Sequence, residues 1–168
     1  MATGGGDATP NKRNVIQERN YMKITTLTKY DKETADRIRE LLIQLSRSGK
    51  DKGEIPESWF KDVIDSPWHD LLMAIDDNGK IIGIATMSVT MGAGIRKNAY
   101  LEDFVTDESV RGQGVGTALW EAMLEWGKSH GCNKLEFTSG HGREAAQAFY
   151  LKQGAEIYDT NFFRKTLA

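Results

Sequence analysis

The stretch that decides the fold of this chain runs from Val110 to Thr117 and reads VRGQGVGT. Its glycines stand at alternate positions, and a backbone without side chains can approach another molecule closely. A strongly periodic helix follows, and its apolar stripe consists of Val115, Ala118, Leu119, Ala122, Met123 and Trp126. The first turn of a helix presents unpaired N–H groups and the positive end of the helix dipole, which together favour phosphate. The turn therefore predicts a phosphate-binding site, to which Arg111 adds a positive charge.

The spacing of the glycines separates this turn from two other phosphate-binding loops. The P-loop signature G-x-x-x-x-G-K-[ST] is absent from the sequence. A dinucleotide-binding fingerprint needs Gly or Ala where this chain has Thr117, and its glycines follow the strand directly, whereas Thr106–Arg111 intervene here. Glu136 lies near the offset at which such a fold keeps its ribose-binding acid. An oxidoreductase domain of that kind therefore stays an alternative.

Periodicity along the rest of the chain predicts a mixed sheet covered by helices. Strands are expected over residues 21–27, 71–76, 80–91, 99–106, 134–138 and 157–165. Helices are expected after an N-cap at Asp31, from Pro56, over 115–130 and over 143–152. This order indicates an α/β (α+β) fold with a mixed, mostly antiparallel sheet of about six or seven strands and about four flanking helices. The strands at either end of the stretch 99–138 should be parallel.

Length and composition favour one domain in a reducing compartment. The chain has 168 residues, of which 39% are hydrophobic, enough for one sizeable core over residues 21–168. Residues 1–20 are polar and glycine-rich and are expected to form a flexible tail, with an arm docked on a neighbouring subunit as the alternative. The single Cys132 is consistent with the cytoplasm and predicts no disulfide.

Charge and residue spacing argue against several partners. The 22 basic and 24 acidic residues are nearly balanced, so neither nucleic acid nor an anionic membrane is an expected partner. No apolar run reaches the ~18 residues that a membrane span needs. The histidines at 69, 130 and 141 are scattered without metal-ligand spacing, so no metal is predicted.

Three segments carry a resemblance to a known family. Arg111–Gly116 fits the pattern R/Q-x-x-G-x-G/A and resembles the signature of the GNAT superfamily of N-acetyltransferases. Residues Ala146–Ala155 look like that family's A-x-x-F-Y-x-x-x-G-F motif, with Ala155 in place of the terminal aromatic residue. The segment Tyr100–Phe104 is similar to the Glu-Asp strand of polyamine and aminosugar acetyltransferases. The resemblance extends from about residue 22 to the C-terminus and implies a GNAT-like acyl-CoA N-acyltransferase fold.

The resemblance implies acetyl-CoA as the co-substrate. The family's strand before the glycine turn pairs with the pantetheine amides, and the amides of the turn hold the pyrophosphate. Transferred position by position, the expected cofactor-binding residues are Phe104, Val105, Thr106, Arg111, Gly112, Gln113, Gly114, Val115, Gly116, Thr117 and Arg143. Arg143 stands where many members carry an asparagine that contacts CoA. Its role is left open between a phosphate contact, a pantetheine contact and a cap on the adjoining helix.

Two residues are candidates for proton transfer during acetylation. Glu102 is the candidate general base, direct or through a water, because a carboxylate in a partly dry cleft has a raised pKa. Strand alternation places Tyr100, Glu102 and Phe104 on one face and Asp103 on the other. Asp103 is the alternative base, and a solvent-facing or salt-bridged Glu102 is the non-catalytic alternative. Tyr150 is the candidate general acid for the CoA thiolate, with core packing as the alternative.

The acceptor and the assembly are less narrowly defined. The resemblance favours a small-molecule primary amine of the polyamine, aminosugar or aminoglycoside kind, chosen by the loop over residues 46–56. A protein N-terminus or lysine is an alternative acceptor, and a catalytically silent acetyl-CoA-binding sensor module is an alternative function. A homodimer formed through the C-terminal strand is common in similar proteins. Cys132 is expected to pack rather than to act as a nucleophile.

Overall fold

The structure is a computed structural model and describes residues 15–19, 21–46 and 48–167. The chain falls into two compact units, Met1–Phe137 and Thr138–Ala168. All six strands and the helices α1 to α3 belong to the first unit, and α4 belongs to the second. That residues 21–168 form one domain stays a prediction. Within the described residues, no helix is both long enough and apolar enough to cross a membrane.

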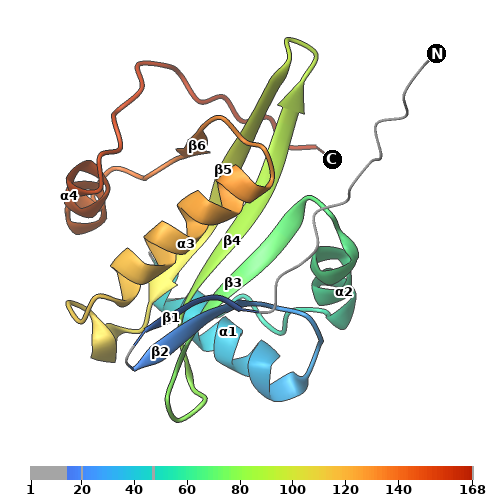
Figure 1. The fold of residues 1–168 in the computed structure, drawn as a ribbon, viewed down its shortest axis with the longest axis vertical. Coiled ribbons are helices and arrows are strands. Elements are labelled where there is room, and N and C mark those ends of the chain that lie inside the picture. The colour runs from blue at the N-terminus through green and yellow to red at the C-terminus, as the bar shows by residue number, and fades with distance from the viewer. Residues whose placement is uncertain (1–14, 20, 47, 168) are drawn as a thin grey trace. The chain divides into compact units, whose positions relative to one another are not determined.

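The first unit is built on one mixed sheet (Figure 1). Its strands are β1 (Val15–Arg19), β2 (Met22–Thr26), β3 (His69–Asp76), β4 (Ile81–Gly92), β5 (Arg96–Thr106) and β6 (Leu135–Phe137). They lie side by side in sequence order. Neighbouring strands are antiparallel except β5 and β6, which are parallel. The mixed, mostly antiparallel α+β sheet and the parallel crossover are therefore confirmed.

The described residues form four α-helices, in agreement with the expected number. They are α1 (Lys32–Leu45), α2 (Glu57–Asp65), α3 (Val115–Ser129) and α4 (Glu144–Lys152), and a short 3₁₀ helix η1 (Glu108–Val110) precedes α3. Asp31 caps α1 as predicted, because its carboxylate accepts a hydrogen bond from the Thr34 amide at 2.8 Å.

Two predicted segments differ from the structure. Val15–Arg19, assigned to the flexible tail, form an edge strand that pairs with β2. An edge strand is held by main-chain hydrogen bonds to a single neighbour and needs no regular apolar face. The polar composition of residues 1–20 therefore gave no sign of strand β1. Residues 1–14 and 20 of the predicted tail lie outside the described residues. The strand predicted over 157–165 is not formed, since those residues have no strand partner in the described sheet.

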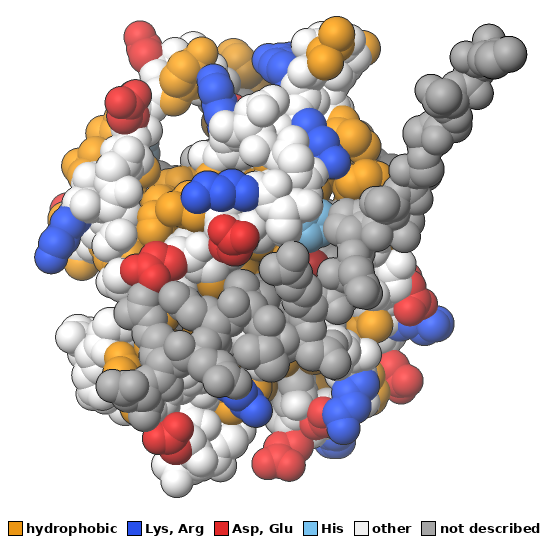
Figure 2. All heavy atoms as spheres, in the orientation of Figure 1, with side chains coloured by type: hydrophobic (Ala, Val, Ile, Leu, Met, Phe, Trp, Pro, Cys, Tyr) orange, Lys and Arg blue, Asp and Glu red, His pale blue; other side chains and the backbone are white. Residues whose placement is uncertain are grey.

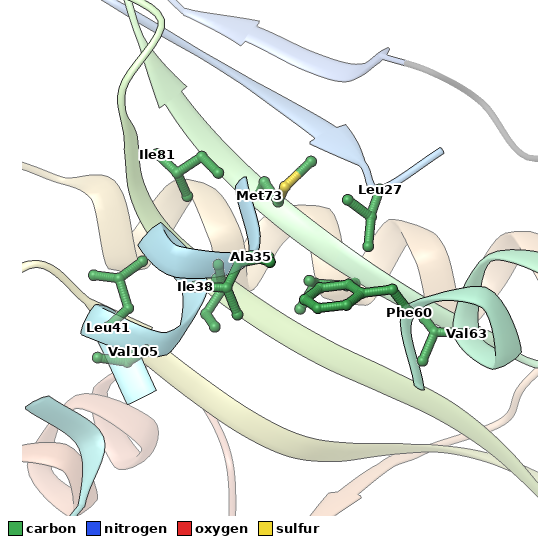
Figure 3. Packing of buried hydrophobic residues seen from close by; sticks show 11 residues of the cluster. Leu27, Ala35, Ile38, Leu41, Phe60, Val63, Met73, Ile81 and Val105 are labelled. Atoms are coloured by element: carbon green, nitrogen blue, oxygen red, sulfur yellow. The ribbon is translucent and has the colours of Figure 1, made fainter. Parts of the chain in front are cut away.

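The core of the first unit fills both faces of the sheet. Figure 3 shows the cluster beneath α1 and α2. This cluster comprises Leu27, Ala35, Ile38, Leu41, Phe60, Val63, Leu71, Met73, Ile81, Ile84 and Val105. The predicted stripe of α3 is buried throughout, with no member more than 3% exposed. A Cβ built on Gly83 would lie 2.9 Å from Leu119 Cδ1 of α3, whereas its neighbour Ile84 joins the α1/α2 cluster. Successive strand residues face opposite ways, so α3 covers the opposite face from α1 and α2.

Acidic and basic side chains are mixed on the face shown in Figure 2. This distribution agrees with the formal net charge of -2 for the whole chain.

Candidate functional site

Strand β5 contains one extra residue relative to β4. Thr86 of β4 pairs with Asp103. The next residue of β4, Met87, pairs with Leu101, so Glu102 is inserted between two pairs. An extra residue of this kind is a β-bulge, which redirects side chains locally. Tyr100 and Glu102 share a face as predicted, and the predicted alternation is wrong from Asp103 onward.

The bulge places two carboxylates on the same face of the sheet. Ser88 Oγ donates a long hydrogen bond to Glu102 Oε1 at 3.5 Å, and Thr86 Oγ1 donates to Asp103 Oδ2 at 3.3 Å. Thr86 and Ser88 are two residues apart on a strand and share one face. Ile84, two residues further back, belongs to the cluster under α1 and α2. Both carboxylates therefore lie on the α1/α2 face.

The two carboxylates differ in their surroundings. Glu102 is exposed, whereas Asp103 is half-buried. Burial raises the pKa of Asp103, although the hydrogen bond from Thr86 and the charge of Lys52 oppose the shift. The burial expected around Glu102 is thus found around Asp103. Lys52 belongs to the loop between α1 and α2, so this loop lies near the carboxylates.

One edge of β5 extends beyond its parallel neighbour. The ladder between β5 and β6 ends at the pair Leu101 and Phe137. Strand β5 continues to Thr106, so the ladder to β6 does not reach residues 102–106 in the described sheet. An extended ligand that pairs with main-chain groups can add to an edge of this kind. The predicted pantetheine contacts Phe104, Val105 and Thr106 all lie on this part of β5.

The glycine turn enters α3 with the predicted geometry. Gly112 and Gly114 have φ angles of 79° and 86°, a left-handed conformation that glycine adopts without strain. Gly114 is the N-cap of α3, and the Ala118 amide donates to its carbonyl at 3.0 Å. The amides of the three residues between them, Val115–Thr117, precede this bond and have no acceptor within the helix. They are three of the five main-chain donors, Gln113–Thr117, expected from the sequence for phosphate, and that use stays a prediction.

An ion pair between Arg37 and the buried Asp107 lies at the end of β5, just before the glycine turn, and sequence reasoning missed it. The guanidinium of Arg37, on α1, pairs with the carboxylate of Asp107 and donates from Nε to the Ile81 carbonyl at 2.8 Å. Asp107 also accepts hydrogen bonds from the Ser109 amide and hydroxyl. Burial alone would raise the pKa of Asp107, but the Ser109 and Arg37 contacts outweigh it and hold the pKa well below its usual range. The Asp-x-Ser spacing was the available signal, because Asp often caps a turn in this way.

Tyr21 also contacts the turn, and no local pattern predicted it. Its hydroxyl donates a hydrogen bond to the main-chain carbonyl of Gln113, which is 92 residues away in the sequence.

The second unit holds the remaining two predicted residues. Arg143 is the N-cap of α4, and Tyr150 lies on that helix beside Phe149, with 5.7 Å between the ring centroids. Burial raises the pKa of Tyr150, and the charge of Arg143 opposes the shift. The first unit therefore brings together Glu102, the β5 edge and the glycine turn, whereas Arg143 and Tyr150 are described within the second.

Two other residue classes offer no competing chemistry in what the structure describes. Cys132 is half-buried, and burial raises the pKa of its thiol, which disfavours the nucleophilic thiolate. Among the described residues, no group of three or more His, Cys, Asp and Glu side chains is arranged to hold a metal ion.

Comparison with known proteins defines the class. The model of the acetyltransferase (GNAT) family matches residues 35–155, so the chain belongs to this family and is an acyltransferase. It is 29% identical over 112 residues to the aminoglycoside N(6')-acetyltransferase type 1 of Serratia marcescens, covering 64% of this chain and 77% of that protein. It is 34% identical over 83 residues to the glucosamine 6-phosphate N-acetyltransferase of Trypanosoma brucei brucei, covering 48% of this chain and 54% of that protein.

A solved structure supports the fold. The aminoglycoside acetyltransferase AAC(6')-Iy, in complex with a CoA bisubstrate analogue, has a TM-score of 0.69 and 22% identity, covering 87% of this chain and 99% of that chain. This likeness concerns the fold alone.

Proposed function

We propose that this protein transfers the acetyl group of acetyl-CoA directly to a primary amine of a small molecule, in a ternary complex. The observation that carries the proposal is the order of three features along β5 and into the start of α3. The two carboxylates at Glu102 and Asp103 are followed by the β5 edge over 104–106 and then by the amides at the start of α3. This order matches a thioester whose diphosphate end lies at the helix and whose reactive end lies at the carboxylates.

The cofactor-binding residues divide between two kinds of contact. The amides of residues 114–117 bind the diphosphate, since donors at a helix N-terminus suit negative charge, and Gly112 lets the turn come close. The Gln113 amide, also expected in this set, donates instead to the Val110 carbonyl at 3.2 Å. Arg111 supplies positive charge to the same ligand. Whether Arg143 contacts a phosphate or pantetheine, or only caps α4, stays as open as the sequence left it. The main-chain groups of Phe104, Val105 and Thr106 pair with the pantetheine arm. Acetyl-CoA itself supplies an activated acyl group.

Proton transfer is assigned to Glu102 and Tyr150. Glu102 accepts a proton from the acceptor ammonium, directly or through a water, and Asp103 is the alternative base. The amine nitrogen then bonds to the acetyl carbon while the carbon–sulfur bond breaks. A main-chain N–H of β5 stabilises the negative charge that develops on the thioester oxygen. Tyr150 donates its proton to the departing thiolate. The new amide nitrogen releases its extra proton to solvent, and the tyrosinate takes a proton from solvent to complete the cycle.

The acceptor follows from the charge at the reactive end. Two carboxylates on one face favour an acceptor with more than one ammonium group, because each charge can pair with one of them. Polyamines and aminoglycosides have this property, whereas an aminosugar with one amine would pair with one carboxylate only, and the Serratia relative is named for acting on aminoglycosides. Residues 48–56 of the loop between α1 and α2 are mostly exposed and lie where they can select among such amines. A cytoplasmic location and a homodimer stay predictions.

A thiol-release assay tests the function. Purified protein is mixed with acetyl-CoA and a panel of polyamines, aminosugars, aminoglycosides and amino-terminal peptides, and free CoA thiol is measured against amine-free controls. Calorimetry with CoA and with NADPH runs in parallel. Amine-dependent thiol release supports the proposal. CoA binding without turnover on any amine favours the sensor module, and NADPH binding without CoA binding favours the dinucleotide-binding alternative.

A further inference from the structure

The turn between β1 and β2 reaches the glycine turn from a different part of the chain. Arg19 pairs with Met22, so Tyr21 lies in the hairpin turn. Met22 is only 3% exposed and pairs with Asp76 of β3, which holds the residue after the turn in the sheet. In Figure 1 this hairpin lies beside the chain that enters α3. Tyr21 is therefore directly followed by a residue that is buried and paired in the sheet.

The contact made by Tyr21 completes a set of bonds around Gln113. The Gln113 amide donates to the Val110 carbonyl at 3.2 Å, and its side-chain Nε2 donates to the Ser109 carbonyl at 3.3 Å. Both of these bonds stay within the turn. The Gln113 carbonyl accepts from the Tyr21 hydroxyl, which ties the turn to the sheet.

This bond determines the direction of one main-chain donor. In a trans peptide the C=O and the following N–H point in opposite directions, so holding the Gln113 carbonyl toward Tyr21 turns the Gly114 N–H away from it. Glycines at 112 and 114 on either side of this segment would otherwise let the peptide rotate. A rotated peptide would turn the Gln113 carbonyl oxygen, in place of the Gly114 N–H, toward the ligand. The partial negative charge of that oxygen would repel a phosphate.

Close packing supports a specific role for the hydroxyl. A Cβ built on Gly114 would lie 3.2 Å from the Tyr21 hydroxyl oxygen, so the tyrosine lies directly against the N-cap of α3. Tyr21 is 41% exposed, and much of its ring is therefore not committed to the core.

We propose that Tyr21 is a positioning residue for the CoA diphosphate, because its hydroxyl holds the Gln113–Gly114 peptide with the Gly114 N–H available to the ligand. This inference rests on the proposed binding of CoA at the start of α3. It assigns Tyr21 no direct contact with the ligand and no part in the chemical step.

The test compares ligands with and without a diphosphate. Dissociation constants for CoA, ADP and pantetheine are measured with the wild-type protein and with Tyr21→Phe, Tyr21→Leu and the control Tyr30→Phe. Losing one hydrogen bond of ordinary strength should weaken CoA and ADP by roughly three- to tenfold in both Tyr21 variants. Pantetheine, which lacks the diphosphate, should bind each variant as it binds the wild type. The Tyr30→Phe variant should match the wild type for all three ligands.

Each result supports or overturns a defined claim, provided that circular dichroism and thermal unfolding show folded variants. If wild-type protein does not bind CoA, the proposed function and this inference both fall. If it binds CoA and Tyr21→Phe binds CoA equally well, only the inference falls. Equal weakening of pantetheine, or a loss in Tyr21→Leu that Tyr21→Phe does not share, also overturns it, since either would mean that the ring supports the structure generally. If Tyr21→Leu does not fold, Tyr21→Phe alone decides.

Discussion

Glu102 and Asp103 are neighbours that a regular strand would separate, and the bulge brings them to one face. Their surroundings suit different tasks. Glu102 is exposed and can meet an acceptor that arrives from solvent, whereas Asp103 is half-buried beside Thr86. We therefore keep Glu102 as the proposed base and expect Asp103 to orient the amine.

Removing the two carboxylates separately tests this division. If Glu102 accepts the proton, Glu102→Gln should lower kcat by about 10²- to 10⁴-fold, the usual contribution of a general base. Asp103→Asn should act mainly on KM for the amine, since it removes a binding charge. Initial rates at saturating acetyl-CoA measure both effects, and Glu33→Gln, at the exposed start of α1, is the control. A larger loss of kcat in Asp103→Asn than in Glu102→Gln would transfer the role of base to Asp103.

Among the elements, α3 packs closely against the sheet because β4 has a glycine, Gly83, at the point of contact. Gly83 of β4 faces this helix, and an added Cβ would lie 2.9 Å from Leu119 Cδ1 and 3.1 Å from the Val105 carbonyl oxygen. One of these neighbours is main chain and cannot move without disturbing the strand that carries the site. The glycine at 83 is therefore required by packing, with no unusual backbone angle involved.

The packing of α3 leads to a stability prediction. Gly83→Ala should lower the free energy of unfolding by roughly 1–3 kcal/mol, as overpacking in a tight core does. The matched control is Gly127→Ala within α3, where the added Cβ meets Ala99 Cβ at 3.3 Å and the helix gains about 1 kcal/mol in propensity. Urea unfolding followed by circular dichroism measures both variants. A Gly83→Ala protein as stable as wild type would contradict the close approach.

Elements with a strong apolar period could be predicted from the sequence, and those defined by pairing could not. The stripe of α3 and the Asp31 cap are local patterns, and both were found where expected. The bulge leaves no trace in residue types, because one inserted residue changes only which partner each neighbour meets. Strand β1 was missed and the strand over 157–165 was wrongly predicted for the same reason. The residue pattern of a segment shows which of its side chains can face a core, but it does not show whether a neighbouring strand is there to pair with it. The Tyr21 contact joins positions 92 residues apart and is likewise invisible to local analysis.

For the molecule as a whole, the Arg37–Asp107 pair connects α1, the start of β4 and the end of β5. Its carboxylate side chain is 7% exposed, and Lys80 Nζ lies 3.8 Å away. Because the pKa of Asp107 is lowered in the folded state, the ionised pair stabilises the fold above the ordinary aspartate pKa, near 3.9. That contribution is lost as the pH falls through the folded pKa.

Acid unfolding of the Asp107→Asn variant tests this contribution. The variant should be less stable than wild type by roughly 1–3 kcal/mol at pH 7, since the substitution removes the buried anion and leaves Arg37 only its more exposed pair with Glu40. The difference should shrink progressively as the pH drops below about 5. Unfolding curves at several pH values measure it. The control, Asp65→Asn, breaks an exposed pair with Lys61 and should change stability by less than about 1 kcal/mol. A difference independent of pH would show that the carboxylate charge is not what matters.

Because Glu102 is inserted, odd-numbered residues of β5 face one side of the sheet before it and the other side after it. Before it, Ala99 meets Gly127 of α3; after it, Val105 joins the cluster beneath α1 and α2, although both positions have odd numbers. Deleting that single residue would leave a regular ladder in which every other residue of β5 keeps its partner and its face. An alignment that places its gap elsewhere in β5 would therefore assign the wrong face to every residue between the misplaced gap and position 102.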